Sequence, residues 1–293
     1  MKKMIFKGSG VALVTPFSDD GVNFDVLEEL LEFHVKNSTD AIIVCGTTGE
    51  PATMTEAEKK EVIKFTVEKI NGRIPVIAGT GGNNTKAVIE MSKYAESVGV
   101  DGLLIVTPYY NKTTQRGLIA HYKEVASSVK LPIIMYNVPG RTGLNIAAKT
   151  VYELSKIENI VGIKEASGNF TQIAEIASLC GDDFYIYSGN DDQVVPMLAL
   201  GAKGVISVWA NVAPNDVHTM VDSFLEGDIE KAKQIQLKAI PLINALFSEV
   251  NPIPVKEAVR QLGFDVGKCR LPLIDMTEEG QLKISEALKE YFG

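Results

Sequence analysis

Lys164 is an unusual position for a charged residue, because it ends an apolar run in the segment I-V-G-I-K-E-A-S-G (160–168). Lysine is seldom fully buried unless another group pairs with it or a reaction uses it. In its uncharged form, which burial favours, the amine can attack a keto group and form a Schiff base. The other interpretation is a lysine at a solvated strand end that pairs with Glu165 or a neighbouring carboxylate. The position of Lys164 alone leaves both interpretations open.

Three hydroxyl-bearing side chains are candidates for the proton transfers that a Schiff-base reaction needs. Tyr136 ends the apolar segment that precedes the Lys164 segment. A tyrosine is too weakly acidic to act alone as a base near neutral pH, so it needs a relay, for which Thr47 and Tyr110 are available. Each of the three has an ordinary explanation as a turn or packing residue. On one rim beside a lysine, the three together favour a proton relay.

The elements that would bring these side chains together are short apolar runs, separated by segments with helical periodicity. Eight such runs predict strands, at 11–16, 41–45, 74–78, 102–107, 132–137, 160–164, 184–188 and 204–208. Nearly all are apolar throughout, as is typical of parallel strands with both faces covered. Repeated strand–helix units over about 225 residues predict an α/β fold of the (β/α)8 TIM-barrel type. A doubly wound open sheet is the alternative, because the number of units does not show closure.

Helix start and stop signals support this alternation and divide the chain. T-E-A-E (55–58) is a capping box, and N-N-T (83–85) and N-D (190–191) supply further N-cap residues. After residue 227 the strand pattern ceases. Helical periodicity continues over 228–247 and 277–291, and N-P-I-P-V-K between them predicts a helix that starts at proline and ends at Gly263. We therefore expect a catalytic barrel over 1–227 and a C-terminal helical region over 228–293.

Catalytic groups of such barrels lie at the carboxyl ends of the strands. At the predicted ends the sequence has T-P-F, G-T-T-G-E, G-T-G-G-N, T-P-Y-Y-N, Y-N-V-P-G-R-T, K-E-A-S-G, S-G-N-D and V-W-A-N. These segments offer hydroxyls, amides, one lysine and one guanidinium, and they contain neither a P-loop nor a complete dinucleotide-binding loop. The set favours a ligand that carries carboxylate and carbonyl groups.

Composition argues against several other classes of protein. A net charge of −8 over 293 residues disfavours a nucleic-acid partner. No uncharged run is long enough to span a membrane, and the N-terminal residues do not resemble a signal peptide. Three scattered cysteines without a C-x-x-C motif favour a reducing cytosol, and three isolated histidines form no metal-binding motif. We therefore expect a cytoplasmic protein with no metal and no membrane partner.

Four motifs together resemble the dihydrodipicolinate synthase family, part of the pyruvate-dependent class I aldolase superfamily. They are G-T-T-G-E (46–50), Y-N-V-P-G-R-T (136–142), G-I-K-E-A-S-G (162–168) and G-V-I-S-V (204–208). The resemblance extends over almost the whole chain, including the helical tail. Arg141 is its most specific sign, because the related N-acetylneuraminate lyases lack an arginine there.

The resemblance implies a role for each matching residue. Lys164 would form a Schiff base with pyruvate, so that no other cofactor is needed. The proton relay would consist of Tyr136, Thr47 and Tyr110, with Tyr110 delivered by a neighbouring subunit. Thr48 would bind the pyruvate carboxylate, and Arg141 would bind the carboxylate of L-aspartate 4-semialdehyde. The pocket lining would include Gly189 and the carbonyl of Ile206. The implied reaction is condensation and cyclisation on the diaminopimelate route to lysine. The implied assembly is a homotetramer built as a dimer of dimers.

One part of the family pattern is altered in this chain. Family members that lysine inhibits carry histidines and a glutamate where this sequence has Glu56, Lys59 and Ala87. Other residues of that allosteric pocket remain, namely Ala52, Asn83 and Tyr109. A lysine ligand would meet the like charge of Lys59, which weakens binding. We therefore expect weak or absent inhibition by L-lysine.

Two other functions remain as alternatives. A sibling 2-keto acid aldolase, of the N-acetylneuraminate lyase or 2-keto-3-deoxygluconate aldolase type, would share the lysine and the barrel, but Arg141 and Thr142 argue against it. A non-catalytic binding protein could keep the pocket. Such a protein would have no use for the complete set of Lys164, Tyr136, Thr47 and Tyr110.

Overall fold

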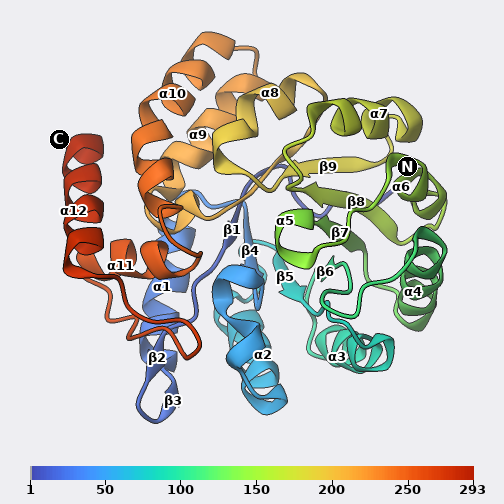
Figure 1. Cartoon of the computed structure of the whole chain (residues 1–293), viewed down its shortest axis with the longest axis horizontal. Coiled ribbons are helices and arrows are strands. Elements are labelled where there is room, and N and C mark those ends of the chain that lie inside the picture. Colours follow the sequence, from blue (N-terminus) through green and yellow to red (C-terminus); the bar gives the residue numbers. More distant parts are fainter. Residues whose placement is uncertain (1) are drawn as a thin grey trace.

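A closed barrel of eight parallel strands forms the centre of the molecule, in a computed structural model that describes residues 2–293 (Figure 1). The strands are β1 (Gly8–Ala12), β4 (Ala41–Val44), β5 (Val76–Gly79), β6 (Gly102–Val106), β7 (Ile133–Asn137), β8 (Ile160–Glu165), β9 (Tyr185–Ser188) and β10 (Gly204–Ser207). The last strand returns to the first, with Gly204 paired to Gly8. The prediction of a TIM barrel is therefore confirmed over the open doubly wound sheet.

Helices surround the barrel and cover its outer face (Figure 1). They are α1 (Phe24–Lys36), α2 (Glu56–Ile70), α3 (Thr85–Ser97), α4 (Gln115–Ser128), α6 (Ala148–Ser155), α7 (Phe170–Cys180), α8 (Val194–Ala199) and α9 (Pro214–Leu225). The short helix α5 (Pro139–Thr142) instead follows the carboxyl end of β7. Short 3-10 turns are η1 (Thr47–Gly49), η2 (Pro51–Thr53), η3 (Asp191–Gln193) and η4 (Trp209–Asn211), and β2 (Phe17–Ser18) pairs with β3 (Gly21–Val22). Among residues 2–293 no helix is long and apolar enough to cross a membrane.

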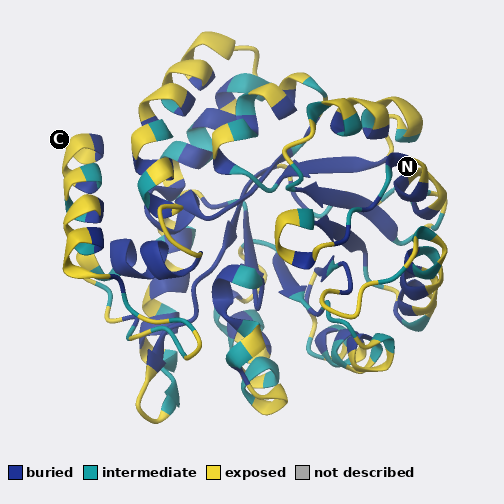
Figure 2. Cartoon of the chain, viewed as in Figure 1, coloured by how far each residue is buried: buried dark blue, intermediate teal, exposed yellow. Residues whose placement is uncertain are grey.

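The strands are apolar throughout because each of their two faces is buried against different partners. Ile42 belongs to the cluster between barrel and helices, whereas its neighbour Ile43 belongs to the cluster inside the barrel. Successive side chains of a strand point to opposite faces, so both kinds of position need apolar residues. Figure 2 shows the strands as the most continuously buried part of the chain.

The predicted helix caps are partly confirmed. Thr55 and Glu58 form the reciprocal capping box of α2, and the Asn84 side chain caps α3. The cap predicted at 190–191 is wrong, since Asn190 makes no capping hydrogen bond with its side chain. The carboxylate of Asp191 binds instead to backbone amides that follow β10.

The bounds of the first strand differ from the prediction. The sequence indicated 11–16, but β1 covers Gly8–Ala12. Residues 8–10 are G-S-G, and such residues are rare in strands, so the pattern hid the true start. At the other end the chain leaves the sheet, and the backbone N–H of Val14 donates to the Asn211 side chain at 3.1 Å.

The C-terminal region is helical, as predicted, and packs on one side of the barrel (Figure 1). It consists of α10 (Ile229–Leu246), α11 (Ile253–Gln261) and α12 (Glu278–Phe292). Pro252 caps α11 and Gly263 follows its end with φ of 101°, which fits the proline start and glycine stop. A domain boundary near residue 227 stays a prediction.

Candidate active site

Lys164 lies at the carboxyl end of β8 and is 5% exposed. Sheet register places it between Tyr136 of β7 and Tyr187 of β9. The Lys164 amine lies 4.4 Å from the centre of the Tyr136 ring. Both tyrosines belong to the cluster inside the barrel. The structure thus brings together the predicted lysine and Tyr136, the first of the predicted relay residues.

Glu165 does not pair with Lys164. Its carboxylate accepts hydrogen bonds from the Asn137 amide at 3.0 and 3.2 Å, from the Ser167 backbone N–H at 2.7 Å and from Gln172 at 3.2 Å. Adjacent strand residues point to opposite faces, so Lys164 and Glu165 diverge. Within residues 2–293, the ion pairs include none that involves Lys164. The interpretation of Lys164 as the partner of Glu165 is therefore wrong.

Asp191 supplies a buried carboxylate that the sequence analysis considered only as a helix cap. Its Oδ2 accepts hydrogen bonds from the backbone N–H groups of Val208 at 3.0 Å and Trp209 at 2.8 Å. Burial raises the pKa of Asp191 above its ordinary value, against the opposing effects of these bonds, of Ser207 and of the Lys164 charge. Asp191 thus fixes the segment after β10 and places a carboxylate within electrostatic reach of Lys164.

Gly189 follows β9 and lies directly against the lysine stem. A Cβ at this position would lie 3.0 Å from Cε of Lys164 and 2.6 Å from Cβ of Ala166. A side chain would therefore displace the lysine, which explains a glycine here. Ile206 is fully buried inside the barrel, one strand further along.

The turn η1 carries Thr47 and Thr48 at the carboxyl end of β4. Thr48 is 2% exposed, whereas Thr47 is half-buried. The Thr48 hydroxyl accepts a hydrogen bond from the Asn251 side chain at 3.0 Å. Asn251 lies just before α11, so the C-terminal region takes part in shaping this turn.

Arg141 lies in α5 and its side chain is exposed. One guanidinium nitrogen donates to the backbone carbonyl of Asn251 at 3.4 Å. Asn251 therefore connects Arg141 with Thr48, two residues for which the sequence predicts carboxylate binding. The sequence analysis missed Asn251, although its segment N-P-I-P-V-K was singled out as a helix start.

Tyr110 is not brought to Lys164 within this chain. Its side chain is 92% exposed, and within residues 2–293 its hydroxyl has no hydrogen-bond partner. Its backbone has φ of 65°, a conformation that is uncommon for a bulky residue. The loop is fixed by Asn83, whose side chain donates to the Tyr109 carbonyl at 3.2 Å. Ala52, the third residue of the predicted allosteric remnant, is exposed on η2.

The three histidines pack in separate places. The Nδ1 atoms of His34 and His121 each lie 2.9 Å from a threonine hydroxyl, and Nδ1 of His218 lies 2.9 Å from an Asp40 oxygen. Within residues 2–293 no three His, Cys, Asp or Glu side chains are grouped so that they could hold a metal ion.

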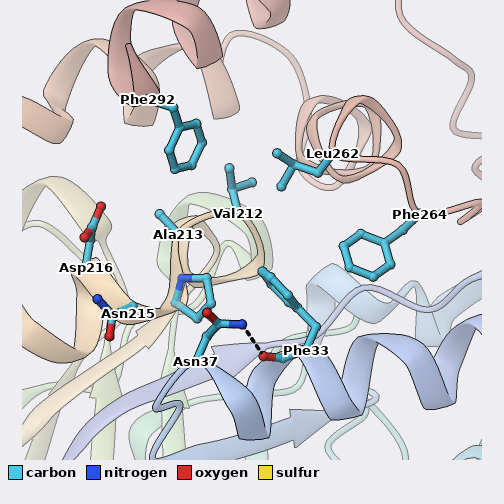
Figure 3. Close-up of a pocket in the computed structure, with 10 residues that line it drawn as sticks. Phe33, Asn37, Val212, Ala213, Asn215, Asp216, Leu262, Phe264 and Phe292 are labelled. Carbon is cyan, nitrogen blue, oxygen red and sulfur yellow. Dashed lines mark hydrogen bonds between the residues drawn. The ribbon is translucent and has the colours of Figure 1, made fainter.

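A pocket of about 370 Å³ lies apart from these residues, between the barrel and the C-terminal helices (Figure 3). The rings of Phe33, Phe264 and Phe292 lie around it. The one charged residue in its lining is Asp216, whose carboxylate accepts a hydrogen bond from Tyr291 at 2.6 Å. This pocket is mainly apolar, and none of its lining residues is a lysine, cysteine, serine or threonine.

Comparison with known proteins gives a consistent result over the whole chain. The model of the Dihydrodipicolinate synthetase family matches residues 5–291. The 4-hydroxy-tetrahydrodipicolinate synthase of Caldicellulosiruptor saccharolyticus is 60% identical over 288 residues, which are 98% of this chain and 97% of the relative. The solved dihydrodipicolinate synthase from Aquifex aeolicus is 49% identical, covers 98% of both chains and superposes with a TM-score of 0.96.

A further solved relative is the chloride-inhibited dihydrodipicolinate synthase from Acinetobacter baumannii complexed with pyruvate. It is 43% identical, with a TM-score of 0.95, and the match covers 98% of this chain and 99% of that one. Identity at this level over the full barrel and the C-terminal helices extends well beyond a shared fold. The chain described here belongs to the dihydrodipicolinate synthetase family.

Proposed function

We propose that this protein is a lyase that condenses pyruvate with L-aspartate 4-semialdehyde, the reaction of 4-hydroxy-tetrahydrodipicolinate synthase in lysine biosynthesis. The observation that carries the proposal is Lys164, a buried amine that lies against the ring of Tyr136 and takes part in no ion pair within residues 2–293. A buried, unpaired amine is costly unless a reaction uses it. Relatives about 58% identical over nearly the whole chain carry this enzyme name.

The first half of the proposed reaction makes a covalent intermediate. The neutral Lys164 amine attacks the keto carbon of pyruvate, and a proton passes to the former carbonyl oxygen. The hydroxyl so formed takes up a second proton and leaves as water, which gives a protonated Schiff base. Removal of a methyl proton then gives an enamine, because the Schiff-base nitrogen accepts the electron pair. This chemistry requires no further cofactor.

The second half joins the two substrates. The enamine carbon attacks the aldehyde carbon of the semialdehyde, and the new alkoxide takes up a proton. The amino group of the semialdehyde then attacks the Schiff-base carbon and displaces the Lys164 amine, which closes the ring. Tyr136, Thr47 and Tyr110 are the proposed route for these protons, since hydroxyls can both donate and accept.

The two substrate carboxylates have separate proposed sites. Thr48 and the backbone amides of its turn would bind the pyruvate carboxylate, with Gly189 and Ile206 lining the pocket. Arg141 would bind the semialdehyde carboxylate, for which a planar guanidinium offers two parallel hydrogen bonds. Support comes from Asn251, which contacts both the Thr48 hydroxyl and Arg141 and so keeps the two sites adjacent.

The proposed relay requires a second copy of the chain. Tyr110 is almost fully exposed, so it can complete a neighbour's site more readily than its own. A tetramer built from two tight dimers accounts for such an exchange. Sedimentation of the active enzyme and the activity of Tyr110→Phe test this together, and a fully active monomer would exclude the exchange.

Regulation by the end product is proposed to be weak, because Lys59 repels a lysine ligand at the altered allosteric pocket. Titration of the activity with L-lysine tests this. Inhibition with a midpoint below roughly 1 mM, equivalent to about 4 kcal/mol of binding, would contradict the proposal.

A substrate panel tests the proposed function directly. Pyruvate is offered with L-aspartate 4-semialdehyde, with N-acetylmannosamine and with glyceraldehyde, and pyruvate consumption is followed. We expect turnover with the semialdehyde at least about 100-fold above the sugar aldehydes, in line with recognition of a carboxylate by Arg141. Preference for a sugar aldehyde would instead assign the chain to a sibling 2-keto acid aldolase, and pyruvate binding with no turnover would indicate a binding protein.

A further inference from the structure

A buried ion pair joins the C-terminal region to the turn that carries Thr47 and Thr48. Lys256 of α11 and Glu50, the residue after η1, lie 2.9 Å apart between Nζ and Oε1. Their side chains are 1% and 0% exposed. The two residues are 206 positions apart in the chain, so only the tertiary fold brings them together.

Both members of the pair have further partners. The Lys256 amine also donates to the Lys268 carbonyl at 3.0 Å and lies 4.6 Å from the centre of the Phe17 ring. The second oxygen of Glu50 accepts a hydrogen bond from the Arg270 backbone at 3.0 Å. Glu50 is therefore held by two separate parts of the C-terminal region, and no oxygen of its carboxylate is left without a bond.

The backbone at Glu50 explains why such a restraint matters for the turn. Glu50 has φ of 55°, the left-handed conformation that a side chain other than glycine seldom adopts. Its N–H donates to the Thr47 carbonyl at 3.2 Å and thereby closes the turn. Strained conformations of this kind persist only where the surroundings impose them. The contacts of the Glu50 carboxylate with Lys256 and with the Arg270 backbone belong to the surroundings of this residue.

We propose that the Lys256–Glu50 ion pair is a positioning device through which the C-terminal region sets the geometry of Thr47 and Thr48, and thus the affinity for pyruvate. The inference rests on the proposed function and adds residues that touch no substrate. A second contact from the C-terminal region, between Asn251 and the Thr48 hydroxyl at 3.0 Å, also restrains this turn. Stability alone is a weak reason for a fully buried pair, because apolar residues of similar volume often serve equally well.

The test measures covalent adduct formation instead of full turnover. Parent enzyme and Lys256→Met are incubated with increasing pyruvate, trapped with borohydride and analysed by intact mass. We expect the pyruvate concentration for half-maximal adduct to rise at least about tenfold in Lys256→Met, at a temperature where circular dichroism shows it folded. The KM for the semialdehyde is expected to stay within about twofold.

A matched control comes from the same helix. Arg260 of α11 also takes part in a salt bridge, with Glu257, and donates to the Gly267 carbonyl at 2.9 Å, but it has no bond to the turn. Arg260→Met is expected to lower the thermal midpoint without changing the half-maximal pyruvate concentration. An equal change in Arg260→Met would show that any destabilisation of α11 has this effect, and would overturn the proposal.

A double variant keeps the test decisive if Lys256→Met fails to fold. Glu50→Gln with Lys256→Met leaves no unpaired buried charge, so it is expected to fold, yet it lacks the ionic restraint on the turn. A raised half-maximal pyruvate concentration supports positioning, and an unchanged one overturns it. Absence of any adduct in the parent enzyme would instead refute the proposed function, and the positioning role with it.

Discussion

Two lysines of this chain are buried, Lys164 at 5% and Lys256 at 0% exposure, but they differ in what surrounds the amine. Lys256 has a carboxylate at 2.9 Å, a carbonyl at 3.0 Å and an aromatic ring. Lys164 also lies over an aromatic ring, that of Tyr136, but has no ion-pair partner within residues 2–293. One amine is thus fully engaged in contacts, and the other is available.

The difference shows how burial of a charged group should be interpreted. A buried lysine whose bonds are satisfied contributes to the structure, and its removal leaves a buried carboxylate without a partner. A buried lysine without an ion-pair partner keeps its amine free to react. Burial alone does not separate these cases, whereas the list of partners does.

The largest effect is expected for the unpaired lysine. Lys164→Met should lower turnover by a factor of about 10³ or more, because no other amine replaces the nucleophile. The thermal midpoint should stay equal to that of the parent or rise, since no ion pair is lost. Turnover and thermal unfolding of the same preparation measure both. Residual activity within tenfold of the parent would remove Lys164 from the mechanism.

For Lys256, which forms an ion pair, the main expected effect is on stability. Lys256→Met is expected to lower the free energy of unfolding by about 3–5 kcal/mol, because Glu50 is left buried without its partner. Urea denaturation of Lys256→Met, Glu50→Gln and the double variant gives the coupling between the two positions. If Lys256→Met were as stable as the parent, the contrast between the two lysines would not hold.

Arg141 separates the second substrate from the lysine chemistry. Arg141→Ala should raise the KM for the semialdehyde about 10- to 100-fold, the equivalent of losing hydrogen bonds to a charged group. Formation of the pyruvate adduct on Lys164 should be unchanged. Arg73→Ala, at another exposed arginine, which pairs with Glu32, serves as the control. An unchanged KM in Arg141→Ala would make Arg141 an ordinary loop arginine.

The smallest expected effect is on the acid sensitivity of the fold, and it involves the Glu58–Arg270 ion pair. Hydrogen bonding from Arg270 lowers the pKa of Glu58 to about 2 from its ordinary 4.5. A carboxyl whose pKa is lowered by folding stabilises the fold at pH values above its pKa in the unfolded chain. This stabilisation is lost as the pH falls from 4.5 towards 2.

Glu58→Gln therefore differs from the parent most at neutral pH, by up to about 1 kcal/mol. Urea midpoints of both proteins at neutral pH and through the acid range should converge as Glu58 becomes protonated. A difference that is constant with pH would show that the Glu58–Arg270 interaction does not depend on ionisation.

The sequence was sufficient for those features that depend on local pattern. The strands could be predicted because both faces of a parallel barrel strand are apolar, and Lys164 was conspicuous because it interrupts this pattern. The start of β1 was missed because glycine and serine occupy Gly8–Gly10 and give no strand signal. Alternation along a strand predicts that Lys164 and Glu165 point to opposite faces. The position of Lys164 in the sequence did not by itself exclude a pair between the two residues.

Other features depend on tertiary contacts that leave no local trace. Asn251 and Lys256 are remote in sequence from Thr48 and Glu50, and no periodicity links them. Asp191 was expected to cap a helix, but burial and the backbone amides after β10 determine its role. The proposed role of Tyr110 requires a second chain, so the contacts within one subunit do not reveal it.

Trapping with pyruvate and borohydride, followed by peptide mapping, identifies the lysine that reacts. We predict one reduced pyruvate adduct per chain, on the peptide that contains Lys164, and an unmodified Lys256. An adduct on Lys256 or another lysine, or no adduct at saturating pyruvate, would contradict it, because the unpaired buried amine would then not be the nucleophile.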